Sequence, residues 1–256
     1  MTFRTINVSS SCETMTIQMN RIAQKNAIND VLVDELNTAI ESASADPNCK
    51  ILVLEGGGGF FCTGMDFSNM LEQQDSSVYG EVTEKYMRLL KNIALAPCCI
   101  ISKVDGQTLA GGVGLVAASD LVVATPKSTF GLSEAMWGLL PSMVIPYLIR
   151  RVGFHKAYTM TLTTANITAE EALQCELVDN VTDDADLVVR RMSQRLLRLQ
   201  KKTIAECKEY FRSAWIIDSA MESRAVKKTT SLVNDPVVRQ NIEDFVKYRI
   251  FPWNKD

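Results

Sequence analysis

Polar and apolar positions along the first half of the chain alternate between a period typical of strands and a period typical of helices. The predicted strands lie at residues 3–8, 14–19, 51–54 and 98–104. The predicted helices lie at residues 26–43 and 81–95. Pro97 ends the second of these helices, since proline cannot continue a helix. Strands that alternate with helices predict an α/β core with parallel strand pairing.

The second half of the chain becomes progressively more helical. Pro141 begins a helical stretch that we expect to run through Arg151, and Thr168 is a predicted N-cap for a helix ending near Cys175. Long, charged helical segments follow at residues 185–214 and 218–249, without further strand candidates. We therefore expect two parts, a core at residues 1–194 and a C-terminal helical region at residues 195–256. Between residues 71 and 80 the polar, irregular sequence predicts a loop.

A glycine-rich stretch, GQTLAGGVGLVAASD, lies between the buried strand at 98–104 and a further apolar run at 121–124. Three glycines within four positions (Gly111, Gly112 and Gly114) need a reason, because glycine carries a conformational-entropy cost. One reason is a backbone that approaches a ligand, with a helix N-terminus behind it that binds negative charge. The other is a tight crossover that packs a helix against a sheet, and the stretch alone does not choose.

The amino-acid composition limits which class of protein and which binding partners are expected. The chain has 256 residues, 46% hydrophobic and 22% charged, as expected for a globular protein with a sizeable core. A net charge of −3 gives no reason to expect a nucleic-acid or anionic-membrane partner. No signal-peptide pattern or membrane-length apolar segment is present, and seven cysteines without a CxxC pair favour reduced thiols in the cytoplasm. No residue spacing suggests a metal site.

Three short segments at the ends of strand candidates carry the candidate chemistry: Gly64-Met65-Asp66, Ala110-Gly111-Gly112 and Ser133-Glu134. Each glycine-bearing turn can offer a backbone N–H to one carbonyl oxygen, which together make an oxyanion hole. Losing one such donor typically costs about 2.7–4 kcal/mol of transition-state stabilisation. A carboxylate with a pKa raised by burial can remove the proton α to that carbonyl. Glu134 lies among apolar neighbours that suit this shift.

At these residues the chain resembles the crotonase (enoyl-CoA hydratase/isomerase) superfamily. The matching segments are Phe61 to Asp66, Asp105 to Gly112, Ser119-Asp120, Phe130 to Glu134 with Gly138 and Pro141, Arg21 with Asn26-Ala27, Ile167 to Ala172, and Leu177 to Asp179. The resemblance implies a spiral of ββα turns with a helical tail that assembles trimers or dimers of trimers. It also implies acyl-thioester substrates, with the N–H groups of Met65 and Gly111 forming the oxyanion hole.

The chain departs from the family pattern at one position. Hydratases of the family carry two acidic residues, of which the second aligns with Glu134 and the first falls on Gly114. A single carboxylate is compatible with two interpretations. The chain is an isomerase, or it is a dehydratase in which Glu134 first removes a proton and then donates it. Closer matches resemble the 3-hydroxy-3-methylglutaryl-ACP dehydratases of polyketide β-branching cassettes, which also have glycine in the first position. These matches are residues 130–134, 146–153, 158–164 and 251–253.

This closer resemblance implies a hydro-lyase that converts 3-hydroxy-3-methylglutaryl-ACP to 3-methylglutaconyl-ACP. The alternatives are a Δ3,Δ2-enoyl-CoA isomerase and a non-catalytic crotonase-fold scaffold. No resident cofactor is expected, because the acyl group travels on the phosphopantetheine of an acyl carrier protein, or on CoA. The expected partners are therefore the carrier protein and further copies of this chain, in a trimer or hexamer.

Other residues have weaker assignments. Asp66, Cys62, Gly112 and Gly114 are candidates for the substrate pocket, with Asp66 more typical of a helix cap and Cys62 lacking a partner for nucleophilic catalysis. His155 and Asp120 are interpreted as a surface residue and a turn residue. Candidates to bind the distal carboxylate of the substrate are Lys103, Arg88 and Lys85. Candidates to dock the acidic carrier protein are Arg150-Arg151 with Lys156, and the run from Arg190 to Lys202.

Overall fold

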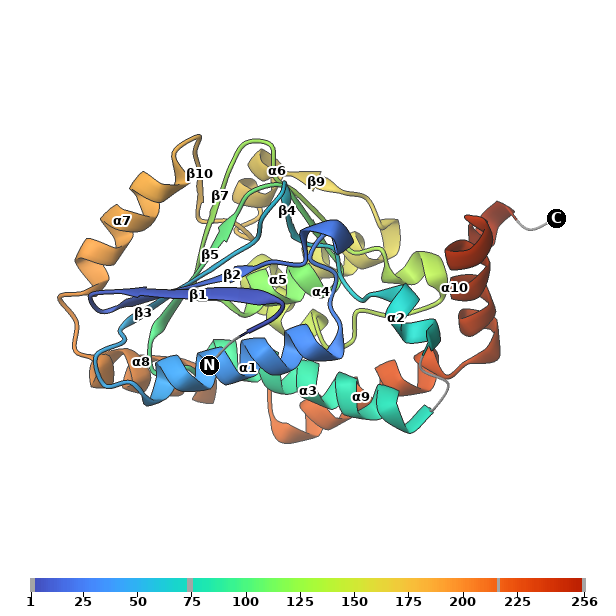
Figure 1. Ribbon diagram of the computed structural model, residues 1–256, viewed down its shortest axis with the longest axis horizontal. Helices are drawn as coiled ribbons and strands as arrows, with labels where there is room; N and C mark the ends of the chain where they lie inside the picture. Colours follow the sequence, from blue (N-terminus) through green and yellow to red (C-terminus); the bar gives the residue numbers. More distant parts are fainter. Residues whose placement is uncertain (1–2, 73–75, 216, 255–256) are drawn as a thin grey trace.

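The computed structural model describes residues 3–72, 76–215 and 217–254, and its strands form two sheets (Figure 1). The larger, six-stranded sheet consists, in spatial order, of β1 (Ile6–Ser11), β2 (Thr14–Met19), β3 (Ile51–Glu55), β5 (Cys99–Val104), β7 (Leu121–Ala124) and β10 (Asn180–Val181). The smaller, four-stranded sheet consists of β4 (Phe60–Cys62), β6 (Gln107–Leu109), β8 (Thr129–Gly131) and β9 (Ile167–Thr168).

Helices follow the strands and then dominate the C-terminal part. The α-helices are α1 (Asp30–Ala45), α2 (Phe67–Glu72), α3 (Ser76–Leu95), α4 (Gly111–Ala118), α5 (Ile145–Thr163), α6 (Ala169–Gln174), α7 (Ala185–Leu196), α8 (Lys201–Ser213), α9 (Ser219–Val233) and α10 (Pro236–Tyr248). Short 3₁₀ helices are η1 (Ile22–Gln24), η2 (Glu134–Trp137) and η3 (Pro252–Asn254).

Successive strand pairs build a spiral. β3, β5 and β7 lie side by side and parallel in the larger sheet, while the strand after each of them (β4, β6 and β8) joins the smaller sheet, again in parallel. A helical segment follows each pair before the chain returns to the sheets. The predicted α/β core with parallel pairing is confirmed, and so is its crotonase-type ββα spiral arrangement.

Both faces of the larger sheet are covered at its central strands β3, β5 and β7, which explains why these strands are largely apolar, whereas β2 alternates buried and half-buried residues. On one face the strand residues join the main core with helices α1, α3 and α4. On the other, Ile51, Ile101 and Val123 pack against Val189 of α7 and Ile204 of α8. Helix α4 is buried along nearly its whole length, so its small and apolar residues serve packing as well as the turn that precedes it.

The predicted N-cap of α6 is confirmed, whereas α1 begins at Asp30, after the predicted start at residue 26. The Asn29 side chain accepts a hydrogen bond from the Leu32 N–H, as expected of the N-cap of α1. Thr168 caps α6 through a capping box: its hydroxyl accepts from the Glu171 N–H, and the Glu171 carboxylate accepts from the Thr168 N–H. The sequence pattern therefore places the start of α6 but not that of α1.

Three further predictions of helix extent are wrong. The predicted loop at 71–80 is helical at both ends, in α2 and α3, while residues 73–75 lie outside the described residues. Helix α5 runs beyond residue 151 to Thr163, across a non-helical Gly153 (φ 76°). Each of the two long C-terminal segments divides into two helices, and Asp235 with Pro236 starts α10 because both residues favour a helix N-terminus.

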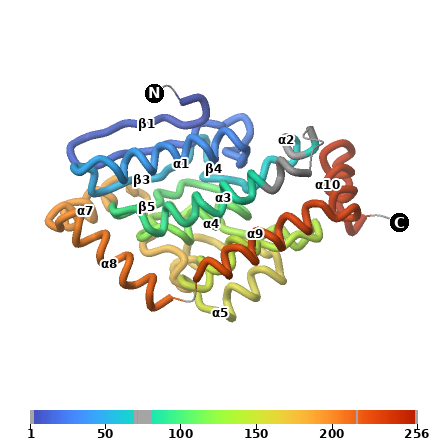
Figure 2. Tube along the Cα trace, turned by 90° about the horizontal axis from the view of Figure 1, so that it is seen from below, coloured from blue at the N-terminus to red at the C-terminus, as the bar shows by residue number. Residues whose placement is uncertain are grey.

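The C-terminal helices pack back onto the same chain. Figures 1 and 2 both show α10 beside α2 at one end of the molecule, with α7 at the other. Helix α9 packs along α3, and α10 contacts η2. Helix α7 spans the expected boundary at residues 194 and 195 and packs on β5 and β7, so the boundary and the trimer-forming role of this region stay predictions.

Candidate active site

The two glycine-bearing turns lie against each other. Gly64 (φ 83°) follows β4 and Ala110 (φ 49°) precedes α4, and both have the left-handed backbone that glycine favours. A Cβ added to Gly64 would lie 2.7 Å from the Ala110 Cβ and 3.5 Å from the Gly111 nitrogen. The first glycine therefore allows the second turn to come into contact, and this brings Met65 and Gly111 together, as predicted.

The backbone pairing around Met65 directs its N–H away from Ile28. The Ile28 N–H donates to the Gly64 carbonyl (2.7 Å), and the Asp66 N–H donates to the Ile28 carbonyl (2.9 Å). Since strand N–H groups alternate in direction, the Met65 N–H between them faces the opposite side. Gly111 begins α4, where the first N–H groups have no partner within the helix. Both residues line a cavity of about 450 Å³.

Close packing behind this cavity makes Gly112 intolerant of a side chain. A Cβ there would lie 2.3 Å from the Cys62 carbonyl oxygen, a backbone atom that cannot move aside. We predict that Gly112→Ala lowers the free energy of unfolding by about 1–3 kcal/mol, measured by denaturant titration. Gly57→Ala is the matched control, because its Cβ would meet ordinary contacts at 3.5 Å. Equal stability of the two variants would contradict the prediction.

Glu134, at the start of η2, lines the same cavity as the two turns. Its side chain is partly exposed to the cavity, but Oε2 is enclosed and has no hydrogen-bond partner among the described residues. Burial raises the pKa of this carboxyl group to about 7, and a hydrogen bond from its own backbone N–H opposes the shift. A carboxylate with this pKa can take up and return a proton near neutral pH.

An aromatic cluster of residues from α2, η2, α10 and the segment after α10 borders the cavity. The Trp137 ring lies 4.6 Å from that of Phe245 and 5.8 Å from that of Phe251, and Phe67 meets it edge-on at 5.5 Å. Phe245 also lines the cavity. The helical tail of the chain therefore completes the apolar wall of its own cavity, and the apolar surroundings predicted for Glu134 include residues more than a hundred positions away.

We predict that kcat/KM rises with pH through about 7, because the free enzyme needs ionised Glu134 to accept a proton.

The raised pKa of Glu134 also makes the stability of the folded chain depend on pH, but stability falls as pH rises. A carboxyl pKa raised above its ordinary 4.5 stabilises the folded state below that value, and this contribution is lost as pH rises through about 7. Unfolding titrations across this range should therefore show less loss of stability for Glu134→Gln than for the parent chain. Parallel pH profiles would contradict the assignment.

The remaining pocket candidates have structural partners. Asp66 lines the cavity and forms an ion pair with Arg21 (2.9 Å), in addition to its position before α2. Cys62 is fully buried, and burial raises its thiol pKa to about 12, which agrees with the prediction that it is no nucleophile. Gly114 is buried in α4, and the hydroxyl group of Tyr86 fills the space beside it. The pattern along the sequence gave no signal for Tyr86.

The cations considered for the distal carboxylate lie elsewhere. Lys103 pairs with Glu55 and with Asp186 (2.8 Å to the latter), and Lys85 pairs with Asp34 (2.8 Å). None of Lys103, Lys85 and Arg88 is among the residues lining the cavity. Within the described chain, the lining cations are Lys25 and Arg249, which stack on Phe60 and Phe245. The cations that line the described cavity are therefore not among the three residues named from the sequence.

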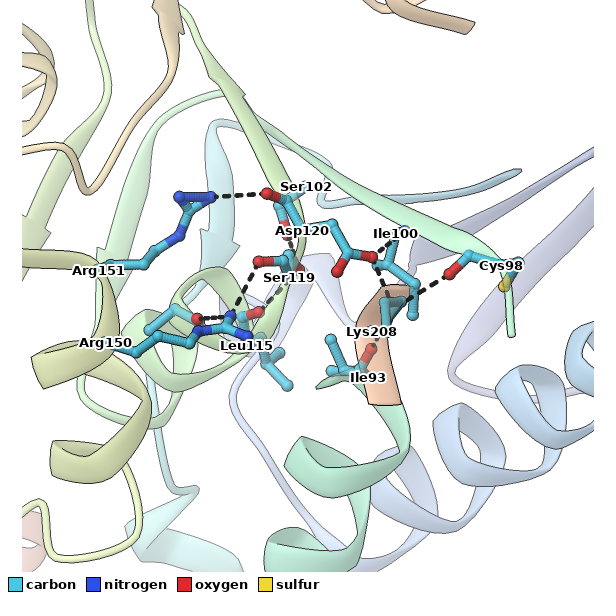
Figure 3. Close-up of polar contacts among 11 residues, drawn as sticks. Ile93, Cys98, Ile100, Ser102, Leu115, Ser119, Asp120, Arg150, Arg151 and Lys208 are labelled. Atoms are coloured by element: carbon cyan, nitrogen blue, oxygen red, sulfur yellow. Dashed lines mark hydrogen bonds and ion pairs between the residues drawn. The ribbon is translucent and has the colours of Figure 1, made fainter. Parts of the chain in front are cut away.

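Figure 3 shows that Arg150 and Arg151 form hydrogen bonds within the chain, Arg150 with the Ser119 carbonyl and Arg151 with the Asp120 carbonyl. Arg150 donates to the carbonyls of Ala117 (2.6 Å) and Ser119 (3.2 Å), and Arg151 donates to the Asp179 carboxylate (3.0 Å). The Arg150 bonds tie α5 to the end of α4, and the Arg151 bond ties α5 to the segment before β10. Arg150-Arg151 with Lys156 stays a prediction for the docking of a carrier protein, with both arginines also bonded within the chain. The run from Arg190 to Lys202, on α7 and the start of α8, stays a prediction for that surface.

The other side chains singled out from the sequence lie outside the cavity. His155 is exposed on α5, as predicted. The Asp120 carboxylate accepts from the Ile100 N–H (2.7 Å) and from Lys208 (2.6 Å), so it bonds a turn, also as predicted. Among the described residues, no three His, Cys, Asp or Glu side chains are grouped in a way suited to a metal ion. The described helices include none long and apolar enough to cross a membrane.

Similarity to known proteins identifies the family to which this chain belongs. The family model described as enoyl-CoA hydratase/isomerase matches residues 11–256. The chain therefore belongs to the enoyl-CoA hydratase/isomerase family, which confirms the resemblance to the crotonase superfamily.

Individual relatives agree with this assignment. The chain is 33% identical over 254 residues to the bacillaene synthase dehydratase PksH of Bacillus subtilis (strain 168), covering 99% of this chain and 98% of that protein. It is 31% identical over 175 residues to a 2,3-dehydroadipyl-CoA hydratase of Escherichia coli (strain K12), covering 68% of each. The likeness to a polyketide dehydratase confirms the closer resemblance seen in the sequence.

Solved structures show the same fold. A crystal structure of PksH from Bacillus subtilis, described as a polyketide biosynthesis enoyl-CoA hydratase, superposes with a TM-score of 0.90 at 32% identity, covering 98% of this chain and 100% of that one. An enoyl-CoA hydratase from Mycobacterium avium gives a TM-score of 0.85 at 25% identity, covering 97% and 98%. These relatives are named hydratases or dehydratases, which is consistent with an enzyme.

Proposed function

We propose that this chain is a hydro-lyase that dehydrates 3-hydroxy-3-methylglutaryl-ACP to 3-methylglutaconyl-ACP during polyketide β-branch formation. One observation carries the proposal: Glu134 is the carboxylate of the described cavity that has no cation partner, since Asp66 is held by Arg21. The position where hydratases of the family have their other acid is Gly114. The similarity to a polyketide dehydratase supports this chemistry over that of a two-acid hydratase.

The proposed reaction uses one acid–base group twice. The thioester carbonyl accepts hydrogen bonds from the Met65 and Gly111 N–H groups, which stabilise negative charge on its oxygen. Ionised Glu134 removes the C2 proton to give the enolate. The electron pair then forms the C2–C3 double bond as the C3–O bond breaks. Protonated Glu134 returns its proton to the departing hydroxide, so that water leaves and the carboxylate is regenerated. A pKa near 7 suits both transfers.

The distal carboxylate of the substrate needs a counter-charge, because a buried unpaired charge is costly. Lys25 and Arg249 line the same cavity and are the partners that we propose for it. In this account, an otherwise identical acyl-ACP that lacks the distal carboxylate is dehydrated with a lower kcat/KM. Equal kcat/KM for both substrates would remove this part of the proposal.

The experiment that separates the candidate functions offers three substrates in parallel: hydroxymethylglutaryl-ACP, hydroxymethylglutaryl-CoA and a 3-enoyl-CoA. Loss of one water from the first, with the ultraviolet absorbance of a conjugated thioester, supports the dehydratase. Conversion of the 3-enoyl-CoA alone identifies an isomerase. If none of the three substrates changes, the non-catalytic crotonase-fold scaffold is the remaining interpretation. Preference for the ACP form over the CoA form supports a carrier-protein partner, which is expected to meet a basic surface.

A further inference from the structure

Tyr86 lies on α3, a helix that packs against α4. Its side chain is 5% exposed and lines the cavity together with Glu134 and Gly111. The hydroxyl group donates a hydrogen bond to the Gly111 carbonyl oxygen at 2.5 Å. This bond satisfies the phenol in the empty site, and it holds the reactive end of the side chain at the first turn of α4.

The same hydroxyl group occupies the space that a side chain at position 114 would need. A Cβ added to Gly114 would lie 2.3 Å from the Tyr86 Oη and 2.9 Å from a methyl group of Val144. Position 114 is where two-acid hydratases of the family carry their first carboxylate. A side chain at position 114 would therefore require Tyr86 and Val144 to move, and in this chain the phenol takes up that space.

From this placement we propose that Tyr86 is a second catalytic residue, which donates a hydrogen bond to the C3 oxygen as it departs. The inference rests on the proposed dehydratase function. When substrate is bound, the hydroxyl hydrogen turns about the Cζ–Oη bond from the Gly111 carbonyl to the substrate oxygen. The C3–O bond breaks, Tyr86 stabilises the charge on the leaving oxygen, and the proton that completes water comes from Glu134. Tyr86 keeps its own proton throughout.

The surroundings of Tyr86 favour a neutral donor. Burial raises the pKa of its hydroxyl group well above the ordinary value, and the nearby Cys62 and Glu134 raise it further. A tyrosinate is therefore disfavoured in this cavity, whereas a hydrogen bond to a developing anion is strengthened by the low local dielectric. In this mechanism Glu134 transfers the proton, and Tyr86 stabilises the negative charge on the leaving oxygen.

The test compares Tyr86→Phe with the parent chain on two carrier-bound substrates. We expect dehydration of hydroxymethylglutaryl-ACP to slow by about 10–100-fold, the range for a lost hydrogen bond to a charged group. On 3-methylglutaryl-ACP, which has no C3 hydroxyl group, exchange of the C2 protons with D₂O should keep its parent rate. That reaction needs only Glu134 and the two N–H donors. Tyr147→Phe is the matched control, because Tyr147 is also buried but does not line the cavity.

The possible results distinguish a catalytic role of Tyr86 from a role in positioning the Gly111 turn. Equal slowing of exchange and dehydration would show that Tyr86 merely positions the Gly111 turn, and would overturn the inference. Unchanged dehydration would also overturn it, while leaving the dehydratase function intact. If the parent chain itself does not dehydrate the substrate, both proposals fail. Should Tyr86→Phe not fold, 3-fluorotyrosine at position 86 keeps the shape and makes the phenol a stronger donor. A dehydration rate unchanged relative to exchange would then count against the inference.

Discussion

Replacement of Glu134 by glutamine is expected to reduce kcat for dehydration by about 10²–10⁴-fold, the usual contribution of a general acid–base group. The side chain keeps its size and its place at the start of η2, but it can no longer accept the C2 proton. Because the parent carboxyl group is enclosed and has a pKa of about 7, the neutral amide should fit without unfolding the chain. Single-turnover conversion of acyl-ACP, followed by intact mass, measures the effect.

Asp66→Asn provides the comparison for this variant. Asp66 lines the same cavity but is bonded to Arg21, so its loss is expected to affect stability more than the chemical step. A Glu134→Gln chain that folds normally and dehydrates at a rate close to the parent would contradict the assignment. A much larger loss in Asp66→Asn, at equal folded fraction, would move the acid–base role to that residue.

Removal of the Gly111 N–H donor is expected to slow the reaction by about 10²–10³-fold. A side-chain mutation cannot test this cleanly, because a Cβ at position 111 would lie 2.8 Å from Ile28 Cδ1 and 3.2 Å from the Tyr86 Oη. Replacing Gly111 by glycolate exchanges the backbone N–H for an ester oxygen without adding a side chain, and it also makes the Ala110 carbonyl a weaker acceptor for the Val113 and Gly114 N–H groups. Since this N–H begins α4, its loss breaks no bond within the helix.

The same ester at Gly59, in the loop before β4, serves as the control. It should leave both kcat and the thermal midpoint close to those of the parent chain. For the Gly111 ester, the account predicts a fall in kcat with the C2-exchange rate falling in parallel, because enolate formation depends on the oxyanion donors. An exchange rate equal to that of the parent would show that the carbonyl oxygen is bound elsewhere.

Much of the interior was predictable because long elements leave a clear period or cap. The apolar run around Leu52 and the Thr168 capping box gave correct elements, since burial on two faces and N-cap chemistry both act locally. The smaller sheet was harder to predict, because a strand such as Phe60–Cys62 is too short to display an alternation. The end of α5 was missed since a glycine at 153 usually interrupts a helix.

The residues of the candidate site could likewise be predicted only in part. Glu134, Met65 and Gly111 were identified from motifs within short segments, and the fold brings all three to one cavity. Tyr86 and Arg249 were missed because they reach the cavity from α3 and from the end of α10, and no spacing along the chain links them to Gly111. Lys103 was misjudged because a lysine in a strand can face either side of the sheet; here it faces Glu55 and Asp186.

The central claim is that one acid, Glu134, dehydrates a carrier-bound hydroxyacyl thioester. Its most direct test is the intact mass of 3-hydroxy-3-methylglutaryl-ACP after incubation with the parent chain and, in parallel, with Glu134→Gln. The account predicts the loss of one water with the parent chain and an unchanged mass with the variant. An unchanged mass with the folded parent chain, or full dehydration by the variant, would contradict it.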